Sequence, residues 1–158
     1  MYKHLKNNKL QETEIFYLNK IYKFIYLMDL NNILFILPKK FQNEKFNKFL
    51  KKNKISYFFI EDARPGCLTN ISTNIQFKNI KINLIILLSF EETKNMALIL
   101  LNENQVLNTP IISNIISPKT PYQNTYPFLN ILNKKTIIFY YSFFYTLFDH
   151  KIKCLKKN

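Results

Sequence analysis

Short apolar runs alternate along the chain with longer stretches of helical periodicity. The runs occupy residues 33–37, 55–60, 82–88 and 111–116. The first is continuously apolar and the others are mostly so, as expected for strands that are buried on both faces of a parallel sheet. Between them, apolar residues recur every three or four positions, which predicts helices over residues 12–28, 41–52, 90–105 and 134–148. This alternation predicts one three-layer α/β domain over residues 1–158, with a mostly parallel sheet.

Several helix features can be read from side-chain types alone. Ser89 followed by Glu92 predicts a capping box at the start of the third helix, and Asn133 is the predicted cap of the last one. The stripe of the first helix contains Ile15, Leu18, Ile21, Tyr22, Ile25 and Met28. The last helix is apolar nearly all round, so we expect it to keep surface for a protein neighbour. Its longest apolar run has 13 residues, too few for the ~20 of a membrane span.

Charge changes this picture only in part. The formal net charge of +13 suggests RNA or an anionic membrane surface as a partner. However, the 22 Ile, 22 Lys and 21 Asn against one Gly indicate A/T-rich codons, so part of the lysine excess reflects base composition. This bias also suggests a gene of an organelle. The excess is concentrated in residues 1–54 and 151–158. Within these ends, residues 1–11 and 150–158 are predicted basic tails.

The chain's single Gly and single Arg flank the same proline. In the sequence Arg64-Pro65-Gly66-Cys67-Leu68-Thr69-Asn70, Pro65 and Gly66 fit the second and third positions of a type II turn. Thr69 and Asn70 could cap that turn locally or bind phosphate and ribose, and Arg64 could hold a phosphate through two donors.

The sequence lacks the residue patterns that most enzymatic reactions need. One glycine excludes glycine-rich phosphate loops. Cys67 and Cys154 stand apart, and His4 and His150 lie outside the predicted strand-end loops, so we expect no metal site, no disulfide and no cofactor. The carboxylates that precede Cys67 would raise the pKa of its thiol and so make it less reactive. We therefore expect a protein that is not an enzyme.

Three stretches carry a family resemblance. Residues 33–40 form an apolar strand followed by a basic pair, and residues 64–70 form a small-residue turn ending in Leu-Thr-Asn. The third stretch is a spacing of Pro110, Pro121, Tyr126 and Pro127. Together they resemble the ribosomal protein S-two family over roughly residues 12–149. Ile116, and Leu129 to Leu132, depart from polar loops of that family.

The resemblance implies a flavodoxin-like fold and a structural role in the small subunit of a ribosome. It implies binding to small-subunit rRNA and to neighbouring ribosomal proteins, with no catalytic residue and no small-molecule substrate. By this resemblance we expect the chain to lack the family's amino-terminal segment, and residues 71–81 to stand where bacterial members insert a helical hairpin. With the codon bias, the mitochondrial matrix is the expected location, and a plastid stays open.

The predicted interface combines residues from the motifs and from the basic helix. The candidate RNA-binding residues are Lys39, Lys40, Lys51, Lys52, Arg64, Thr69 and Asn70, with Pro65 and Gly66 as the structural turn. Each lysine could equally belong to a solvated helix face. The alternative function is a basic membrane-surface protein, or another RNA-binding α/β protein.

Overall fold

One parallel sheet organises the chain. The computed structural model describes residues 16, 18–40, 42–70, 81–114, 125–127 and 134–156. Its strands are β1 (Ile33–Leu37), β2 (Ser56–Phe59), β3 (Leu84–Leu87), β4 (Ile111–Ser113) and β5 (Thr125–Pro127). They lie in the order β2-β1-β3-β4-β5, and every neighbouring pair is parallel. Because this is the strand order of flavodoxin-like folds, the predicted fold class is confirmed.

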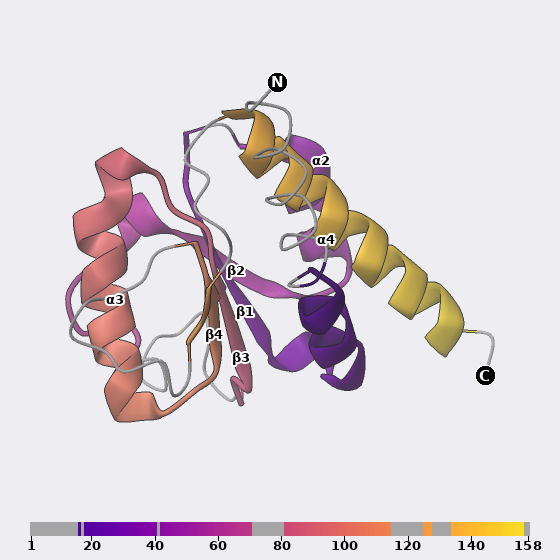
Figure 1. Cartoon of the computed structure of the whole chain (residues 1–158), viewed down its shortest axis with the longest axis horizontal. Coiled ribbons are helices and arrows are strands. Elements are labelled where there is room, and N and C mark those ends of the chain that lie inside the picture. Colours follow the sequence, from indigo (N-terminus) through magenta and orange to yellow (C-terminus); the bar gives the residue numbers. More distant parts are fainter. Residues whose placement is uncertain are drawn as a thin grey trace, which may run out of the picture.

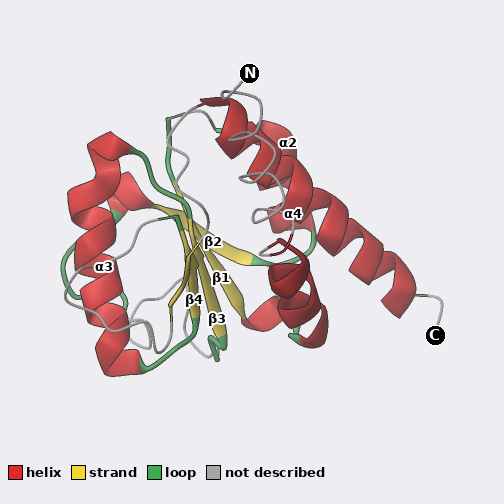
Figure 2. Ribbon diagram, in the orientation of Figure 1, coloured by secondary structure: helices red, strands yellow, loops and turns green. Residues whose placement is uncertain are grey.

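Helices cover both faces of the sheet. α3 (Lys94–Leu107) lies on one face, and a helix at residues 18–27, α2 (Glu44–Lys52) and α4 (Lys134–Leu155) lie on the other (Figures 1 and 2). Successive side chains of β1 point to opposite faces, so Phe35 packs on the α2 and α4 side while Leu34 and Ile36 pack toward α3. All five residues of β1 are buried, as its continuous apolar run predicts.

An aromatic cluster joins the sheet to two helices. The ring of Phe35, which is fully buried, makes edge-to-face contacts with Phe46 of α2 and with Phe144 and Phe148 of α4. The ring centroids are 5.5, 5.6 and 5.5 Å apart, within the range that favours such pairs. Phe46 also contacts Tyr141 at 5.2 Å. One side chain of β1 therefore fixes α2 and α4 side by side on the same face.

The third helix begins differently from the prediction. The capping box of Ser89 and Glu92 does not form, because the backbone N–H of Ser89 already donates to Asn114 Oδ1 at 2.8 Å. Ser89 Oγ instead pairs with Thr93 Oγ1 at 2.9 Å. A short 3-10 turn, η3 (Glu91–Thr93), precedes α3, which therefore starts at Lys94. It ends at Leu107, two residues beyond the predicted end, at a left-handed Asn108.

Two further predictions need correction, and two lie outside the described residues. β2 is only half-buried rather than fully buried, because it is the edge strand of the sheet. Tyr22 is 38% exposed, whereas Ile21 and Ile25 of the same predicted stripe are buried. Asn133, the predicted cap of the last helix, lies outside the described residues. So do residues 115–116, the predicted end of the fourth strand.

The last helix extends beyond its predicted end at residue 148. α4 runs to Leu155, so most of the predicted basic tail at 150–158 is helical. Lys151 ties this extension to the rest of the fold: it is only 8% exposed, and its ammonium donates to the carbonyl oxygens of Ile25 (3.2 Å) and Met28. These carbonyls lie at the end of the helix at 18–27, where a cation is favourable. Burial lowers the pKa of Lys151, and the carboxylate of Asp29 opposes that shift.

We predict that Phe35→Ala lowers the free energy of unfolding by about 3–5 kcal/mol, because it leaves a cavity between the sheet, α2 and α4. Phe139→Ala is the control, since that ring is 49% exposed, and it should cost about 1 kcal/mol or less. Urea unfolding of both variants measures the difference. Equal losses would show that the Phe35 cluster does not hold these elements together.

Candidate nucleic-acid interface

The carboxyl ends of the parallel strands bring two of the sequence motifs to one edge of the sheet. Lys39 and Lys40 follow β1 directly, and η2 (Ile60–Asp62) and the residue 64–70 turn follow β2. Because β1 and β2 pair in parallel with Leu37 opposite Phe59, the two loops emerge next to each other. This edge is where ligands bind in open α/β sheets, so it is the first place to look for an interface.

The turn at Arg64 to Cys67 has the predicted geometry. The backbone N–H of Cys67 donates to the carbonyl oxygen of Arg64 at 3.0 Å, and Gly66 has φ +86°. These values match a type II turn, and Pro65 and Gly66 are confirmed in their structural role. A Cβ at Gly66 would lie 3.1 Å from the side-chain amide of Asn70, so a larger residue would be strained both by its φ and by this contact.

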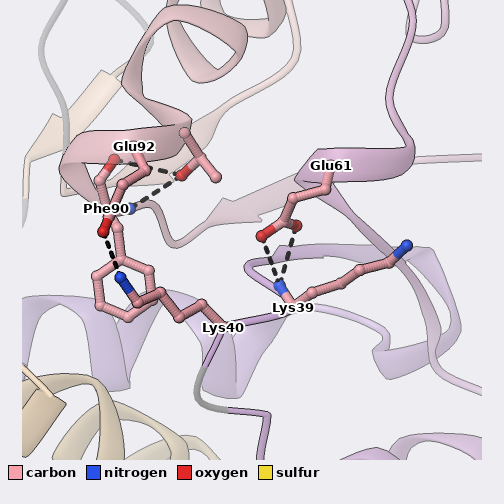
Figure 3. Close-up of polar contacts among 6 residues, drawn as sticks. Lys39, Lys40, Glu61, Phe90 and Glu92 are labelled. Atoms are coloured by element: carbon pink, nitrogen blue, oxygen red, sulfur yellow. Dashed lines mark hydrogen bonds and ion pairs between the residues drawn. The ribbon is translucent and has the colours of Figure 1, made fainter.

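Two carboxylates anchor these loops: Glu103, which the sequence analysis did not single out, and Glu61, which it considered only as one of the carboxylates that precede Cys67. Glu103 of α3 accepts the backbone N–H groups of Gly66 and of Leu68, the latter at 3.0 Å. Glu61 accepts the backbone N–H of Lys39 with both of its oxygens, each at 2.9 Å (Figure 3). Hydrogen bonds to a charged acceptor are stronger than neutral ones, so both loops are held firmly against the sheet.

The two lysines after β1 are ion-paired in the folded protein. Lys39 Nζ lies 2.5 Å from Asp62 Oδ1, and Lys40 pairs with Glu92. Figure 3 shows their side chains pointing in opposite directions along the edge. The bond from Lys40 lowers the pKa of Glu92, although both partners are well exposed. An RNA phosphate would have to compete with these carboxylates.

Charge at this edge is close to balanced. The three cations Lys39, Lys40 and Arg64 stand against the four carboxylates of Glu61, Asp62, Glu92 and Glu103, a sum of 3 − 4 = −1. Arg64 is exposed and forms no ion pair with any residue that the structure describes. It is therefore the cation of this edge that a phosphate could reach without displacing a carboxylate.

The end of the turn is partly occupied by local bonds. Thr69 Oγ1 donates to the carbonyl oxygen of Gly66 at 3.1 Å, and the backbone N–H of Asn70 donates to the same oxygen at 2.9 Å. Both residues are exposed. The hydroxyl of Thr69 is thus used as a cap, and its lone pairs can still accept a hydrogen bond from a ribose hydroxyl.

Lys51 and Lys52 lie far from the other candidates. They form the last turn of α2, which runs back from the carboxyl edge, and the chain then enters β2 at its opposite, amino end. Both lysines are exposed, as are Lys45 and Lys48 of the same helix. The structure therefore divides the predicted residues into two groups at opposite ends of the sheet.

Other site chemistry can be stated for the described residues. Burial raises the pKa of the Cys67 thiol, and Glu103 of α3 raises it further. The direction is the predicted one, but the responsible carboxylate is Glu103 and not the carboxylates that precede Cys67 in the sequence. Within the described ranges, no three His, Cys, Asp or Glu side chains gather as a metal site would need. No helix in this part of the chain is long and apolar enough to cross a membrane.

We predict that Glu103→Gln lowers the pKa of Cys67 toward its ordinary value, because the nearby negative charge is removed while the burial remains. The midpoint of iodoacetamide alkylation against pH, measured with Cys154→Ser as background, should shift downward. Glu92→Gln, which removes a carboxylate bound to Lys40 instead, should leave the midpoint in place. An unchanged midpoint in Glu103→Gln would contradict the contact between α3 and the turn.

Comparison with known proteins leaves the family open. No family model matches the chain, and no curated protein matches it significantly. Membership of the S-two family therefore stays a prediction that depends on the three sequence stretches and on the fold.

Proposed function

We propose that this chain is a structural protein of the small subunit of the mitochondrial ribosome, related to the S-two family, and that it binds small-subunit rRNA and neighbouring proteins. One observation carries the proposal: each of the three resembling stretches borders a strand of a sheet with flavodoxin-like order. The basic pair follows β1, and the Leu-Thr-Asn turn follows β2 and η2. Pro110 precedes β4, while Tyr126 and Pro127 belong to β5. Pro121 lies outside the described residues.

The way the loops are held supports a scaffold role. Glu61 and Glu103 fix backbone N–H groups of neighbouring loops, and Thr69 caps the turn. Loops fixed in this way present a constant shape, which suits recognition of a folded RNA surface by its backbone. We propose Arg64 as the leading phosphate contact of this edge. Lys39 and Lys40 contribute when a phosphate displaces the carboxylates of Asp62 and Glu92 from them.

The last helix supports contact with a neighbouring protein. α4 buries Tyr141, Phe144 and Phe148 in the core and leaves Ile138 and Phe139 44% and 49% exposed near its amino end. A pair of large apolar side chains on one turn is a common anchor of protein interfaces. Occupation of this turn by another ribosomal protein is part of the proposed function.

We expect the full-length protein to sediment with small ribosomal subunits when mitochondrial lysate is fractionated on a sucrose gradient. Ribonuclease treatment before fractionation should move the protein toward the top. Affinity for RNA comes mainly from phosphate neutralisation, and digestion removes the phosphate backbone to which the protein binds. A tagged copy of the chain, detected by immunoblot across the fractions, measures both distributions.

Two results would end the proposal. If the untreated protein stays at the top of the gradient, it is not a subunit component. If it instead floats with liposomes of anionic lipid at the salt concentration used for the gradient, the membrane-surface alternative replaces the ribosomal one. A matched Arg64→Gln chain shows how much of the sedimentation depends on the carboxyl edge.

A further inference from the structure

A basic groove lies between α2 and α4, on the far side of the molecule from α3. It has a volume of about 320 Å³. One wall is formed by α2 and the residue after it, with Lys45, Lys48, Phe49, Lys52 and Asn53, and the other by α4 and the residue after it, with Tyr145, Asp149, Ile152, Lys153 and Lys156. The lining lysines of α2 follow a spacing of three and four residues, so they share one helix face. The groove exists only where the two helices pack together, because each of them contributes one of its walls.

Aromatic contacts hold the two walls together. The rings of Phe49 and Tyr145 meet with centroids 4.8 Å apart, and both side chains are partly buried against the core. The ammonium of Lys45 lies 5.3 Å from the centroid of the Tyr145 ring, a cation–π distance. Because the rings pack on each other, they serve as the joint between the helices and do not offer open faces for base stacking.

The charge of the groove is strongly positive. Five lysines against Asp149 give 5 − 1 = +4 for the lining residues, and Glu44, which reaches Lys48 at 3.9 Å, reduces this to +3. Lys153 pairs with Asp149 at 2.6 Å, which raises the pKa of Lys153. Within the described part of the chain, Lys52 and Lys156 have no carboxylate within ion-pair distance. The carboxyl edge, by comparison, sums to −1.

A concave surface bordered by ammonium groups fits a phosphodiester backbone. Lysine ammonium groups are point charges that attract phosphates without reading bases, so binding here would be independent of sequence and sensitive to salt. An anionic membrane is flatter, and peripheral binding to it uses apolar side chains that project beside the cations. In this groove the apolar side chains form the joint between the helices, which favours RNA.

We propose that the groove between α2 and α4 is the main RNA-backbone site of this protein, and that the carboxyl edge with Arg64, Lys39 and Lys40 is secondary. The proposal rests on the proposed RNA-binding function and locates it on a surface that the sequence motifs do not mark. It also separates two neighbouring candidates, because Lys52 lines the groove and Lys51 does not. Their side chains are matched in type, in helix and in exposure.

The test compares charge-matched variants of the full chain. The groove variant carries Lys45→Gln, Lys48→Gln and Lys52→Gln, and the control carries Lys20→Gln, Lys23→Gln and Lys81→Gln, three lysines that are also exposed. Glutamine keeps good helix propensity, and urea unfolding checks that both variants are folded. Affinity for a short mixed-sequence RNA duplex is measured by fluorescence anisotropy over a range of salt concentrations.

We expect the groove variant to lose about 100-fold in affinity at about 0.1 M salt and to reduce the log–log salt slope by about 2 to 3, since three phosphate contacts are removed. The control variant should change affinity by no more than about threefold, because its lysines act only through screened long-range fields. Among single variants, Lys52→Gln should weaken binding several-fold more than Lys51→Gln.

Equal losses in the groove and control variants would overturn the groove as the site, since only net charge would then matter. Stronger binding of the wild-type chain to vesicles containing phosphatidylserine than to RNA would overturn the choice of ligand. Failure of the proposed function looks different: the wild-type chain would be absent from small subunits on gradients. Failure of the groove alone would leave wild-type sedimentation intact and the groove variant still bound to subunits.

Discussion

The contact of Phe35 with three aromatic rings is the interaction on which the arrangement of the molecule depends. Phe35 is part of β1, and its partners Phe46, Phe144 and Phe148 belong to α2 and α4. The same packing that buries one face of the sheet therefore also sets the two helices side by side, and Phe49 and Tyr145 continue the contact outward. The basic groove is a consequence of core packing, which gives its lysines a fixed spacing.

The carboxyl edge of the sheet and the groove between α2 and α4 differ in their charge. At the carboxyl edge, Glu61 and Glu103 hold the loops through backbone N–H groups, and Lys39 and Lys40 are engaged by carboxylates. In the groove between α2 and α4, lysines outnumber carboxylates. Rigid loops at the carboxyl edge and an excess of positive charge in the groove are compatible with the proposed role, in which the protein contacts both RNA and neighbouring proteins.

Sequence patterns predicted the local features well. The buried strands β1, β3 and β4, the basic face of α2 and the turn at Pro65 and Gly66 depend on neighbouring residues or on residues a few positions apart, and the structure has them. The flavodoxin-like fold was predicted from the family resemblance and not from periodicity. Within a predicted helix, the exposure of Tyr22 shows that a wide apolar stripe need not be buried across its whole width.

The features that sequence could not supply are contacts between distant residues. Glu103 reaches Leu68 over 35 positions, and Lys151 reaches Met28 over 123. A helical pattern shows neither contact, so α4 was predicted to end at 148 and Glu103 was not singled out. The groove was missed for the same reason, because the lysines of α2 and α4 gain a common surface only when the two helices pack together.

The most direct test is the reactivity of each lysine within the assembled small subunit. Acetylation by acetic anhydride, read by mass spectrometry, should show Lys45, Lys48, Lys52, Lys153 and Lys156 protected in the subunit and reactive after ribonuclease treatment. Lys151, which is buried in the protein itself, should react slowly in both states and serves as the internal reference. Groove lysines that react equally with and without RNA would contradict the account.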